Sequence, residues 1–235
     1  MAQPDIHEAP LGLQAVLFDM DGTLIDSEDL WWSAECQVME DQGVIWSRDD
    51  QVHCLGGPLE RVTAYMAEKP GATASPQELG RDLLDTMETL LRTDAIEWRP
   101  GAFELLMECR DAGVPTALVS ASHRRLLDAV SDHVSHKPGL AQPAFDVTVA
   151  GDEVSEGKPH PEPYLEAARL LGVDIRRCVV VEDSPTGVAS GQASGALVLA
   201  VPHLAGIDAA ARRRVMTSLD DVCLEDLMHW VSLTP

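Results

Sequence analysis

The strongest constraint on the fold of this chain is a short apolar run, residues 15–18 (AVLF), that leads directly into Asp19 and Asp21. An apolar run of this length closed by a turn signal is typical of a buried strand in a parallel sheet, and we predict this first strand over about residues 14–19. Ligands of open α/β sheets bind just beyond the carboxyl ends of the strands, and Gly22 allows the chain to turn sharply there. The run therefore predicts two carboxylates at a ligand site, where they can hold a metal ion, attack an electrophile or move protons.

Strands and helices alternate in the part of the chain that follows residue 97. We predict strands over residues 115–119, 145–150, 178–181 and 197–201. We predict helices over residues 102–112, 124–130, 161–171 and 187–194, and a final helix over residues 219–230. This alternation indicates right-handed βαβ units. The predicted fold is α/β, with a Rossmann-like, doubly wound parallel sheet covered by helices on both faces.

The stretch between the first strand and residue 97 has a different pattern. Apolar residues recur there at helical spacing over residues 29–42, 59–67 and 76–91, and we find no convincing strand pattern between them. We therefore expect an inserted, all-helical domain over residues 27–97, and a core domain made of residues 13–26 and 98–235.

Charge restricts the partners of the chain. The net charge is −22 and no basic stripe is evident, so we expect no nucleic-acid partner. The arginine tract at residues 212–214 is expected to be a solvated helix face. No apolar run approaches the ~20 residues of a membrane span, and residues 1–12 lack the basic and apolar regions of a secretory signal, so we expect no membrane association and a frayed N-terminal tail. An enzyme that acts on anions in so acidic a chain needs a local positive centre, which a divalent metal and one or two cations supply.

The cysteines indicate a reducing compartment. The five are scattered singly, at Cys36, Cys54, Cys109, Cys178 and Cys223. Their odd number and the lack of a CxxC pair argue against a disulfide framework or a zinc site. Cysteines of this kind are usually small buried apolar residues in a reducing cytosol, so the predicted localisation is cytoplasmic.

Polar side chains stand where the predicted strands end. The set comprises Asp19 and Asp21 after the first strand, Ser120 after the second, Lys158 in the loop after the third, and Glu182 and Asp183 after the fourth. Because the carboxyl ends of parallel strands share one edge of a sheet, we expect these side chains to converge. Neither helical periodicity nor burial requires polar residues at these positions.

Charge also decides which chemistry this set suits. A phosphate ester repels an approaching carboxylate, so an aspartate nucleophile requires that the phosphoryl charge be neutralised. Mg²⁺ held by oxygen ligands does this; Lys158 adds a second positive centre, and the Ser120 hydroxyl and nearby backbone N–H groups hold the remaining oxygens. Attack by Asp19 gives an aspartyl-phosphate, and Asp21 can protonate the leaving alkoxide and then accept a proton from water. Ser122 is expected to cap the helix that follows.

Four motifs, in this order, resemble those of a known superfamily. They read DMDGTLIDS at residues 19–27, LVSAS at 118–122, GKPHPEPY at 157–164 and VEDSPTG at 181–187. Together with a helical insert directly after the first motif, they resemble the haloacid dehalogenase-like (HAD) hydrolase superfamily over about residues 14–201. The chain is most similar to the helical-cap members close to the β-phosphoglucomutase-like phosphatase branch.

The resemblance implies the catalytic and metal-binding residues. Asp19 is the implied nucleophile, and Asp21 is the implied general acid and base. The implied cofactor is Mg²⁺, held by the Asp19 side chain, the Asp21 backbone carbonyl and Asp183, with Glu182 a ligand or a close neighbour.

The resemblance also implies how substrate is held. Ser120, Ala121 and Lys158 would bind the phosphoryl group. Residues 27–97 would form a mobile cap that closes over the site, excludes water and contacts the leaving group.

Three cap residues are candidate substrate contacts, namely Trp31, His53 and Arg61. Trp31 can equally serve to pack the first cap helix, whereas His53 and Arg61 flank residues 56–58, where caps of this superfamily often reach toward the site. Helical-cap mutases place a histidine where this chain has Trp31, which favours net hydrolysis. Phosphonate-cleaving relatives use a lysine early in the cap to form a Schiff base. Residues 27–68 contain no lysine, which argues against that chemistry here.

The predicted function is therefore a Mg²⁺-dependent phosphatase of a small phosphorylated metabolite, a sugar or polyol phosphate, that works through an aspartyl-phosphate. The alternatives are a sugar-phosphate mutase of the β-phosphoglucomutase type and a catalytically silent binding protein on the same scaffold. We expect the protein to be a monomer.

Overall fold

The structure is a computed structural model that describes residues 12–54, 58–135, 143–203 and 206–234. Most of the expected frayed tail, residues 1–11, lies outside the described residues.

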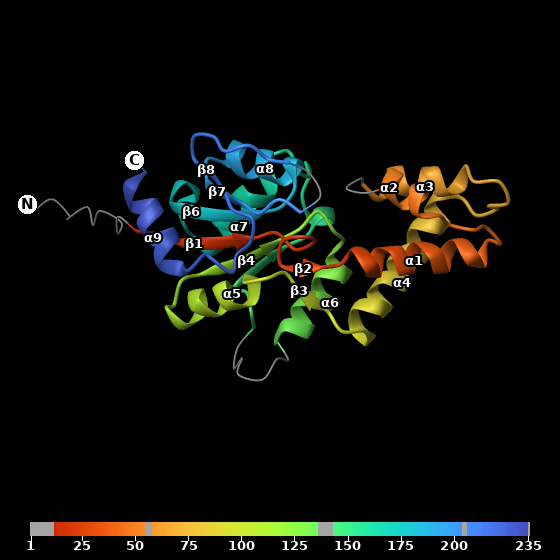
Figure 1. The fold of residues 1–235 in the computed structure, drawn as a ribbon, viewed down its shortest axis with the longest axis horizontal. Helices are drawn as coiled ribbons and strands as arrows, with labels where there is room; N and C mark the ends of the chain where they lie inside the picture. The colour runs from red at the N-terminus through yellow and green to blue at the C-terminus, as the bar shows by residue number, and fades with distance from the viewer. Residues whose placement is uncertain (1–11, 55–57, 136–142, 204–205, 235) are drawn as a thin grey trace, which may run out of the picture.

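A six-stranded parallel sheet forms the centre of the larger part of the chain (Figure 1). Its strands are β1 (Ala15–Phe18), β4 (Thr116–Val119), β5 (Val147–Val149), β6 (Cys178–Glu182), β7 (Leu197–Ala200) and β8 (Arg213–Val215). They lie in the order β5-β4-β1-β6-β7-β8, and every neighbouring pair is parallel. β1 pairs with β4 on one side and with β6 on the other, so the strand order reverses at β1. A crevice suited to a ligand forms at such a switch point.

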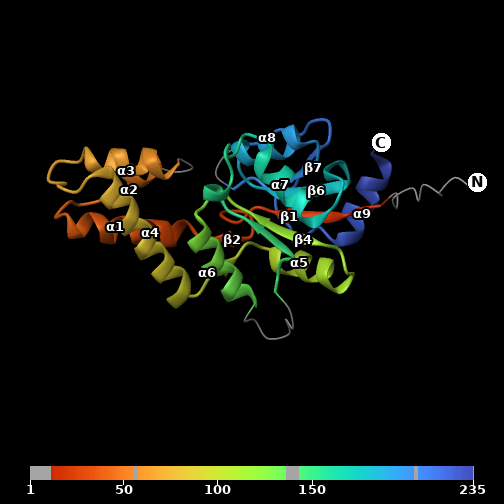
Figure 2. The same ribbon diagram turned by 180° about the vertical axis from the view of Figure 1, so that it is seen from behind.

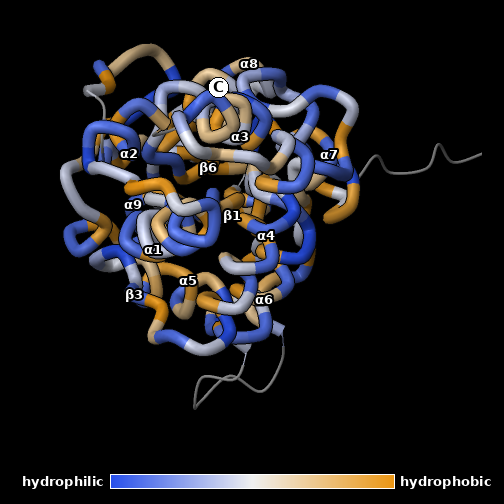
Figure 3. The backbone as a smooth tube through the Cα atoms, turned by 90° about the vertical axis from the view of Figure 1, so that its right-hand side faces the viewer, coloured by the Kyte–Doolittle hydropathy of each residue, from blue (hydrophilic) through white to orange (hydrophobic). Residues whose placement is uncertain are grey.

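The sheet is buried on both faces, which explains why its strands read as continuous apolar runs. Side chains alternate: Val16 and Phe18 belong to one buried cluster, and Ala15 and Leu17 belong to another. Helices α5 (Ala102–Asp111), α6 (Arg124–Ser135) and α9 (Leu224–Leu233) cover the first face, and α7 (Glu162–Leu171) and α8 (Pro185–Ser194) cover the second (Figures 1 and 2). Figure 3 shows hydrophobic colour around β1 and β6, toward the centre of the molecule.

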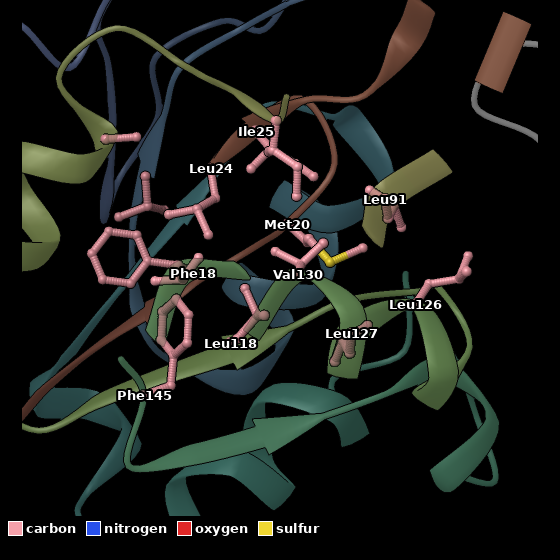
Figure 4. Packing of buried hydrophobic residues seen from close by; sticks show 14 of the residues in the cluster. Phe18, Met20, Leu24, Ile25, Leu91, Leu118, Leu126, Leu127, Val130 and Phe145 are labelled. Carbon is pink, nitrogen blue, oxygen red and sulfur yellow. The ribbon is translucent and has the colours of Figure 1, made fainter. Parts of the chain in front are cut away.

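The first cluster shows how tightly strands and helices pack. The rings of Phe18 and Phe145 meet edge to face, with centroids 6.4 Å apart, a favourable geometry for an aromatic pair. Leu118 of β4 and Leu127 of α6 are fully buried in the same cluster, and Leu91 joins it from the helical insert (Figure 4). The apolar core is therefore continuous from the sheet into the insert.

The insert is all-helical and stands beyond the carboxyl ends of the strands (Figure 1). Its helices are α1 (Glu28–Asp41), α2 (Arg48–Cys54), α3 (Leu59–Ala67) and α4 (Pro76–Thr93). Two short strands, β2 (Ile25–Asp26) and β3 (Glu97–Trp98), pair antiparallel where the chain enters and leaves it. Arg99 Nη1 lies 3.2 Å from Asp26 Oδ2 and fastens these two connections together.

Polar side-chain contacts join the insert to the core at two further places. On one side, Arg125 of α6 lies 2.6 Å from Asp85 and 2.7 Å from Glu88 of α4. On the other side, His203 Nε2, in the segment after β7, lies 2.7 Å from Glu28 Oε1 at the start of α1.

Two predictions of secondary structure are wrong. Helix α2 was not expected, yet Ser47 and Asp50 cap it reciprocally: Asp50 Oδ2 accepts from the Ser47 amide at 2.9 Å, and Ser47 Oγ accepts from the Asp50 amide at 3.3 Å. This S-x-x-D pattern is the sequence signal that was overlooked. The arginine tract is not a helix face, because Arg213 and Arg214 lie in edge strand β8, where the Arg214 guanidinium lies over the Trp230 ring.

Smaller differences concern the ends of elements. Helix α6 continues to Ser135, five residues past the predicted end, and α9 begins at Leu224 rather than at residue 219. Single-turn 3₁₀ helices occupy Gly151–Glu153 and Ile175–Arg177. All five cysteines are free, as expected. Within the described part of the chain, no helix is both long enough and apolar enough to cross a bilayer.

Candidate active site

The carboxyl ends of three adjacent strands bring the predicted polar residues together. Asp19 follows β1, Ser120 follows β4, Glu182 is the last residue of β6 and Asp183 comes next. All four are buried. The side chain of Lys158 enters this cluster from the loop before α7, so the convergence predicted from the strand ends is present.

Lys158 uses all three of its N–H donors inside the cluster. Its Nζ lies 2.6 Å from Asp19 Oδ1, 2.7 Å from Glu182 Oε1 and 3.0 Å from the carbonyl oxygen of Val119. The side chain is only 4% exposed. A buried ammonium persists when it is paired and fully hydrogen-bonded, and the two carboxylates raise the pKa of Lys158 above its usual value despite burial. Lys158 is therefore a fixed positive charge directly beside Asp19.

Acidic charge exceeds basic charge in this cluster. Asp19, Glu182 and Asp183 each offer a carboxylate oxygen, and these oxygens lie within 4.8 Å of one another. Burial, followed by the charge of Glu182, raises the pKa of Asp19 well above its usual value and that of Asp183 to about 7. Three carboxylates against one ammonium leave a negative surplus that a divalent cation would neutralise, and oxygen ligands are those that Mg²⁺ prefers. The residues present therefore fit a magnesium ion.

Glycine is required on one side of this cation site. Gly22 has φ +80°, and a Cβ atom there would lie 2.4 Å from Asp183 Oδ2. Thr23, the next residue, donates its hydroxyl hydrogen bond to Asp183 Oδ1 at 3.1 Å. The turn after β1 thus positions Asp183 as well as Asp19.

Glu182 is enclosed by donors. In addition to Lys158, its Oε1 accepts a hydrogen bond of 2.7 Å from the Tyr164 hydroxyl, and its Oε2 accepts one of 3.2 Å from the Ser184 hydroxyl. A Cβ atom on Gly187 would lie 1.7 Å from Glu182 Oε1, so the start of α8 also depends on a glycine. Ser184 caps this helix by accepting from the Gly187 amide at 3.0 Å.

The side chain of Asp21 is held from the insert and from the core together. Its Oδ1 accepts from Ser27 Oγ at 2.6 Å and, weakly, from Trp31 Nε1 at 3.5 Å. Its Oδ2 accepts from Ser122 Oγ at 2.8 Å and, weakly, from Ser120 Oγ at 3.5 Å. The indole of Trp31 therefore contacts an aspartate of the site and does not only pack its own helix.

The prediction that Ser122 caps α6 is wrong. Its hydroxyl binds Asp21, and the first amide of α6, at Arg124, donates instead to Asp152 Oδ1 at 2.8 Å. Ala121 is exposed in the same loop, between the two serines that contact Asp21.

The other cap candidates make their described contacts inside the cap. The His53 ring stacks on Tyr65 with centroids 4.2 Å apart, and Arg61 Nη2 donates to the carbonyl oxygen of Cys54 at 3.3 Å. Residues 56 and 57, expected near the site, lie outside the described residues. The sequence reasoning gave no role to Thr23, Ser27 or Tyr164, although each stands within a recognised motif.

Comparisons with known proteins identify a family for most of the chain. The sequence profile of a family described as haloacid dehalogenase-like hydrolase matches residues 16–201. Hexitol phosphatase B of Escherichia coli K12 is 33% identical over 195 residues, which cover 82% of this chain and 85% of that protein.

Solved structures agree as well. CbbY from Rhodobacter sphaeroides, in complex with phosphate, superimposes with a TM-score of 0.78 at 28% identity and covers 92% of this chain and 99% of its own. A mutant of that protein in complex with xylulose-1,5-bisphosphate gives a TM-score of 0.75 with the same identity and coverage. A putative β-phosphoglucomutase from Thermotoga maritima, 24% identical and covering 95% of this chain and 100% of its own, shares the fold with a TM-score of 0.70.

Proposed function

The chain belongs to the haloacid dehalogenase-like hydrolase family, and on this premise we propose that it is a Mg²⁺-dependent phosphatase of a small phosphorylated sugar or polyol. The observation that carries the proposal is the Asp19 carboxylate fixed against Lys158 inside a buried cluster with surplus negative charge. The names of the relatives support the substrate class, because one is a hexitol phosphatase and another binds a sugar bisphosphate.

Asp19 is the proposed nucleophile. Lys158 holds Asp19 Oδ1 at 2.6 Å, which fixes the carboxylate and leaves its other oxygen for the phosphorus atom. The bond from phosphorus to the ester oxygen breaks as the bond to Asp19 forms, which gives an aspartyl-phosphate that water then hydrolyses. The positive charge of Lys158 offsets the repulsion between the carboxylate and the phosphoryl oxygens. Mg²⁺, when held by Asp19, Asp183 and the Asp21 carbonyl with Glu182 as a ligand or neighbour, supplies further charge neutralisation.

Asp21 is the proposed general acid and base. Its protonated carboxyl group donates a proton to the departing alkoxide, and the carboxylate left behind takes a proton from the attacking water. Ser27 and Trp31 on the insert side and Ser122 on the core side fix its two oxygens. Ser120, Ala121 and Lys158 are proposed to bind the phosphoryl group.

The cap is proposed to select the substrate. We propose residues 27–97 as its extent, and Trp31, His53 and Arg61 as the residues that meet the leaving group. We also propose that the protein is a cytoplasmic monomer without a nucleic-acid or membrane partner, in keeping with its net charge of −22.

Phosphate release tests the proposal. Purified protein is incubated with a chromogenic phosphate ester and with a panel of phosphorylated sugars and polyols, with Mg²⁺ and with a chelator. We expect inorganic phosphate to be released only with Mg²⁺, and Asp19→Asn to lose turnover by about three orders of magnitude or more because it removes the nucleophile. Asp29→Asn, an exposed change on α1, is the control and should retain activity.

Each alternative has its own signature in this assay. An isomerised sugar phosphate without net phosphate release identifies a mutase. Binding of a sugar phosphate without turnover identifies a silent scaffold, and an active Asp19→Asn protein contradicts the covalent route.

A further inference from the structure

Tyr164 lies buried beside the candidate site, and the proposed function gives it no role. It belongs to α7 and is 0% exposed, in the apolar cluster that contains Leu17 and Val119. A buried tyrosine hydroxyl requires a hydrogen-bond partner. Its partner is Glu182 Oε1, at 2.7 Å, and Glu182 is itself 0% exposed.

The same tyrosine also contacts Lys158. The Lys158 Nζ atom lies 4.9 Å from the centroid of the Tyr164 ring, within the range in which a ring face attracts a cation. Tyr164 thus contacts both members of the Lys158–Glu182 ion pair, one through its hydroxyl and the other through its ring.

We propose that Tyr164 is a positioning residue that keeps the Lys158 ammonium against Asp19. It does so by donating a hydrogen bond to Glu182 and so satisfying part of the hydrogen-bonding capacity of that carboxylate. This inference rests on the proposed function, in which Lys158 holds the nucleophile and the phosphoryl group. Glu182 Oε1 receives two donors, Lys158 at 2.7 Å and Tyr164 at 2.7 Å. The ammonium is shared in turn between Glu182 and Asp19, which binds it at 2.6 Å.

The physical reason is competition for one ammonium. A buried carboxylate that loses a donor gains in attraction for the donors that remain, because no water replaces the lost hydrogen bond. Without the phenol hydroxyl, Glu182 draws Lys158 toward itself and away from Asp19. The ring fills the space beside the ammonium and excludes water from it. Burial and the adjoining carboxylates raise the pKa of Tyr164 well above its usual value, so the hydroxyl stays a neutral donor.

The chain offers a matched pair of variants, because its two tyrosines each donate a 2.7 Å hydrogen bond to a carboxylate. Tyr164→Phe removes the hydroxyl on Glu182, and Tyr65→Phe removes the hydroxyl on Asp50 inside the cap. We expect Tyr164→Phe to lower kcat about tenfold and to weaken inhibition by inorganic phosphate by a similar factor, with Mg²⁺ affinity changed less than twofold. We expect Tyr65→Phe to leave all three quantities within twofold of wild type.

A double-mutant cycle separates positioning from a general loss of structure. If Tyr164 acts through Glu182, then adding Tyr164→Phe to a Glu182→Gln protein should lower kcat by less than twofold. In the Glu182→Gln protein the buried side chain carries no charge, so the loss of the Tyr164 hydroxyl leaves no carboxylate short of a hydrogen-bond donor. The double variant therefore allows the comparison even where Tyr164→Phe alone is unstable. Equal effects of Tyr164→Phe in both backgrounds, or unchanged kcat and phosphate inhibition in the single variant, overturn the inference.

A crystal structure of the Tyr164→Phe protein tests the inference without any activity. We expect Lys158 Nζ to move from Asp19 toward Glu182. If the ammonium keeps its contacts with Asp19, Glu182 and Val119, the inference is wrong even when the protein is an active phosphatase. If wild-type protein releases no phosphate from any ester while the ammonium moves as expected, the proposed function fails and the positioning role stands.

Discussion

Glu35 links the stability of the cap to pH in a way that can be measured. This residue lies on the inner face of α1 and is 5% exposed, and its Oε2 accepts a hydrogen bond from Trp46 Nε1 at 2.9 Å. Burial is the main cause that raises the pKa of Glu35 from 4.5 to about 7. The folded chain therefore binds a proton at this site between these two pH values, where the unfolded chain has released it.

The sign and size of the effect follow from that difference. A raised carboxyl pKa means that stability is highest below pH 4.5 and is lost as the pH rises to about 7. The full shift corresponds to about 3 kcal/mol, since each pKa unit is worth about 1.36 kcal/mol. Relaxation of the surrounding protein around the charged carboxylate reduces the expected loss to about 2 kcal/mol.

Glu35→Gln should remove this loss, because glutamine keeps an acceptor for Trp46 and carries no charge. We expect the variant to gain about 2 kcal/mol over wild type as the pH rises from about 5 to about 8, or about 4–8 °C in Tm. Urea and thermal unfolding of the whole chain, followed by circular dichroism and tryptophan fluorescence, measure the difference at each pH. Glu40→Gln, an exposed change on the same helix, is the control. A difference between Glu35→Gln and wild type that does not change with pH would refute this reasoning.

Further outcomes can be checked on the same protein. Asp183→Asn should weaken Mg²⁺ binding at least about tenfold in a calorimetric titration. In a chelator at high pH the same variant should raise Tm, because it relieves the repulsion between Asp183 and Glu182. A variant that binds Mg²⁺ like wild type would exclude Asp183 as a ligand. Gly187→Ala should destabilise the fold by about 2 kcal/mol or more, because its Cβ meets Glu182, whereas Gly206→Ala, with open space around it, should stay within about 0.5 kcal/mol in urea unfolding. Arg125→Ala should cost less than about 1 kcal/mol despite its two ion pairs, because both pairs are partly exposed to solvent. A larger loss that persists in high salt would contradict this view of the cap–core contact.

Local signals account for the elements that the sequence predicted well. The bounds of α3, Leu59–Ala67, were predicted to the residue because its apolar positions repeat at helical spacing. The strand ends that carry Asp19, Ser120 and Asp183 were located because each follows an apolar run buried on both faces. The arginine tract was wrongly predicted to be a helix face because β8 is polar in sequence. It becomes a strand only by pairing with β7, and no local sequence pattern contains this tertiary effect.

The same distinction separates the parts of the site. The structure brings together the motif residues that were predicted at the strand ends, whereas the contacts of Ser122 and Tyr164 with distant partners were not predicted. Ser122 read as a helix cap because that is its usual local role, but its partner Asp21 lies 101 positions away. Tyr164 was quoted as part of the third motif but received no role, since its partner Glu182 comes from another element. Hydrogen bonds between elements become visible only when the strands are assembled.

The paired strands β2 and β3 have a consequence for how such proteins diversify. The chain leaves the core at Ile25–Asp26 and returns beside it at Glu97–Trp98, so both chain connections of the helical insert lie side by side at one junction. At this junction the helical insert of a relative can replace that of this chain without breaking the sheet or separating the residues around Lys158. The fold thereby allows the insert, which is proposed to select the substrate, to change while the residues around Lys158 stay the same.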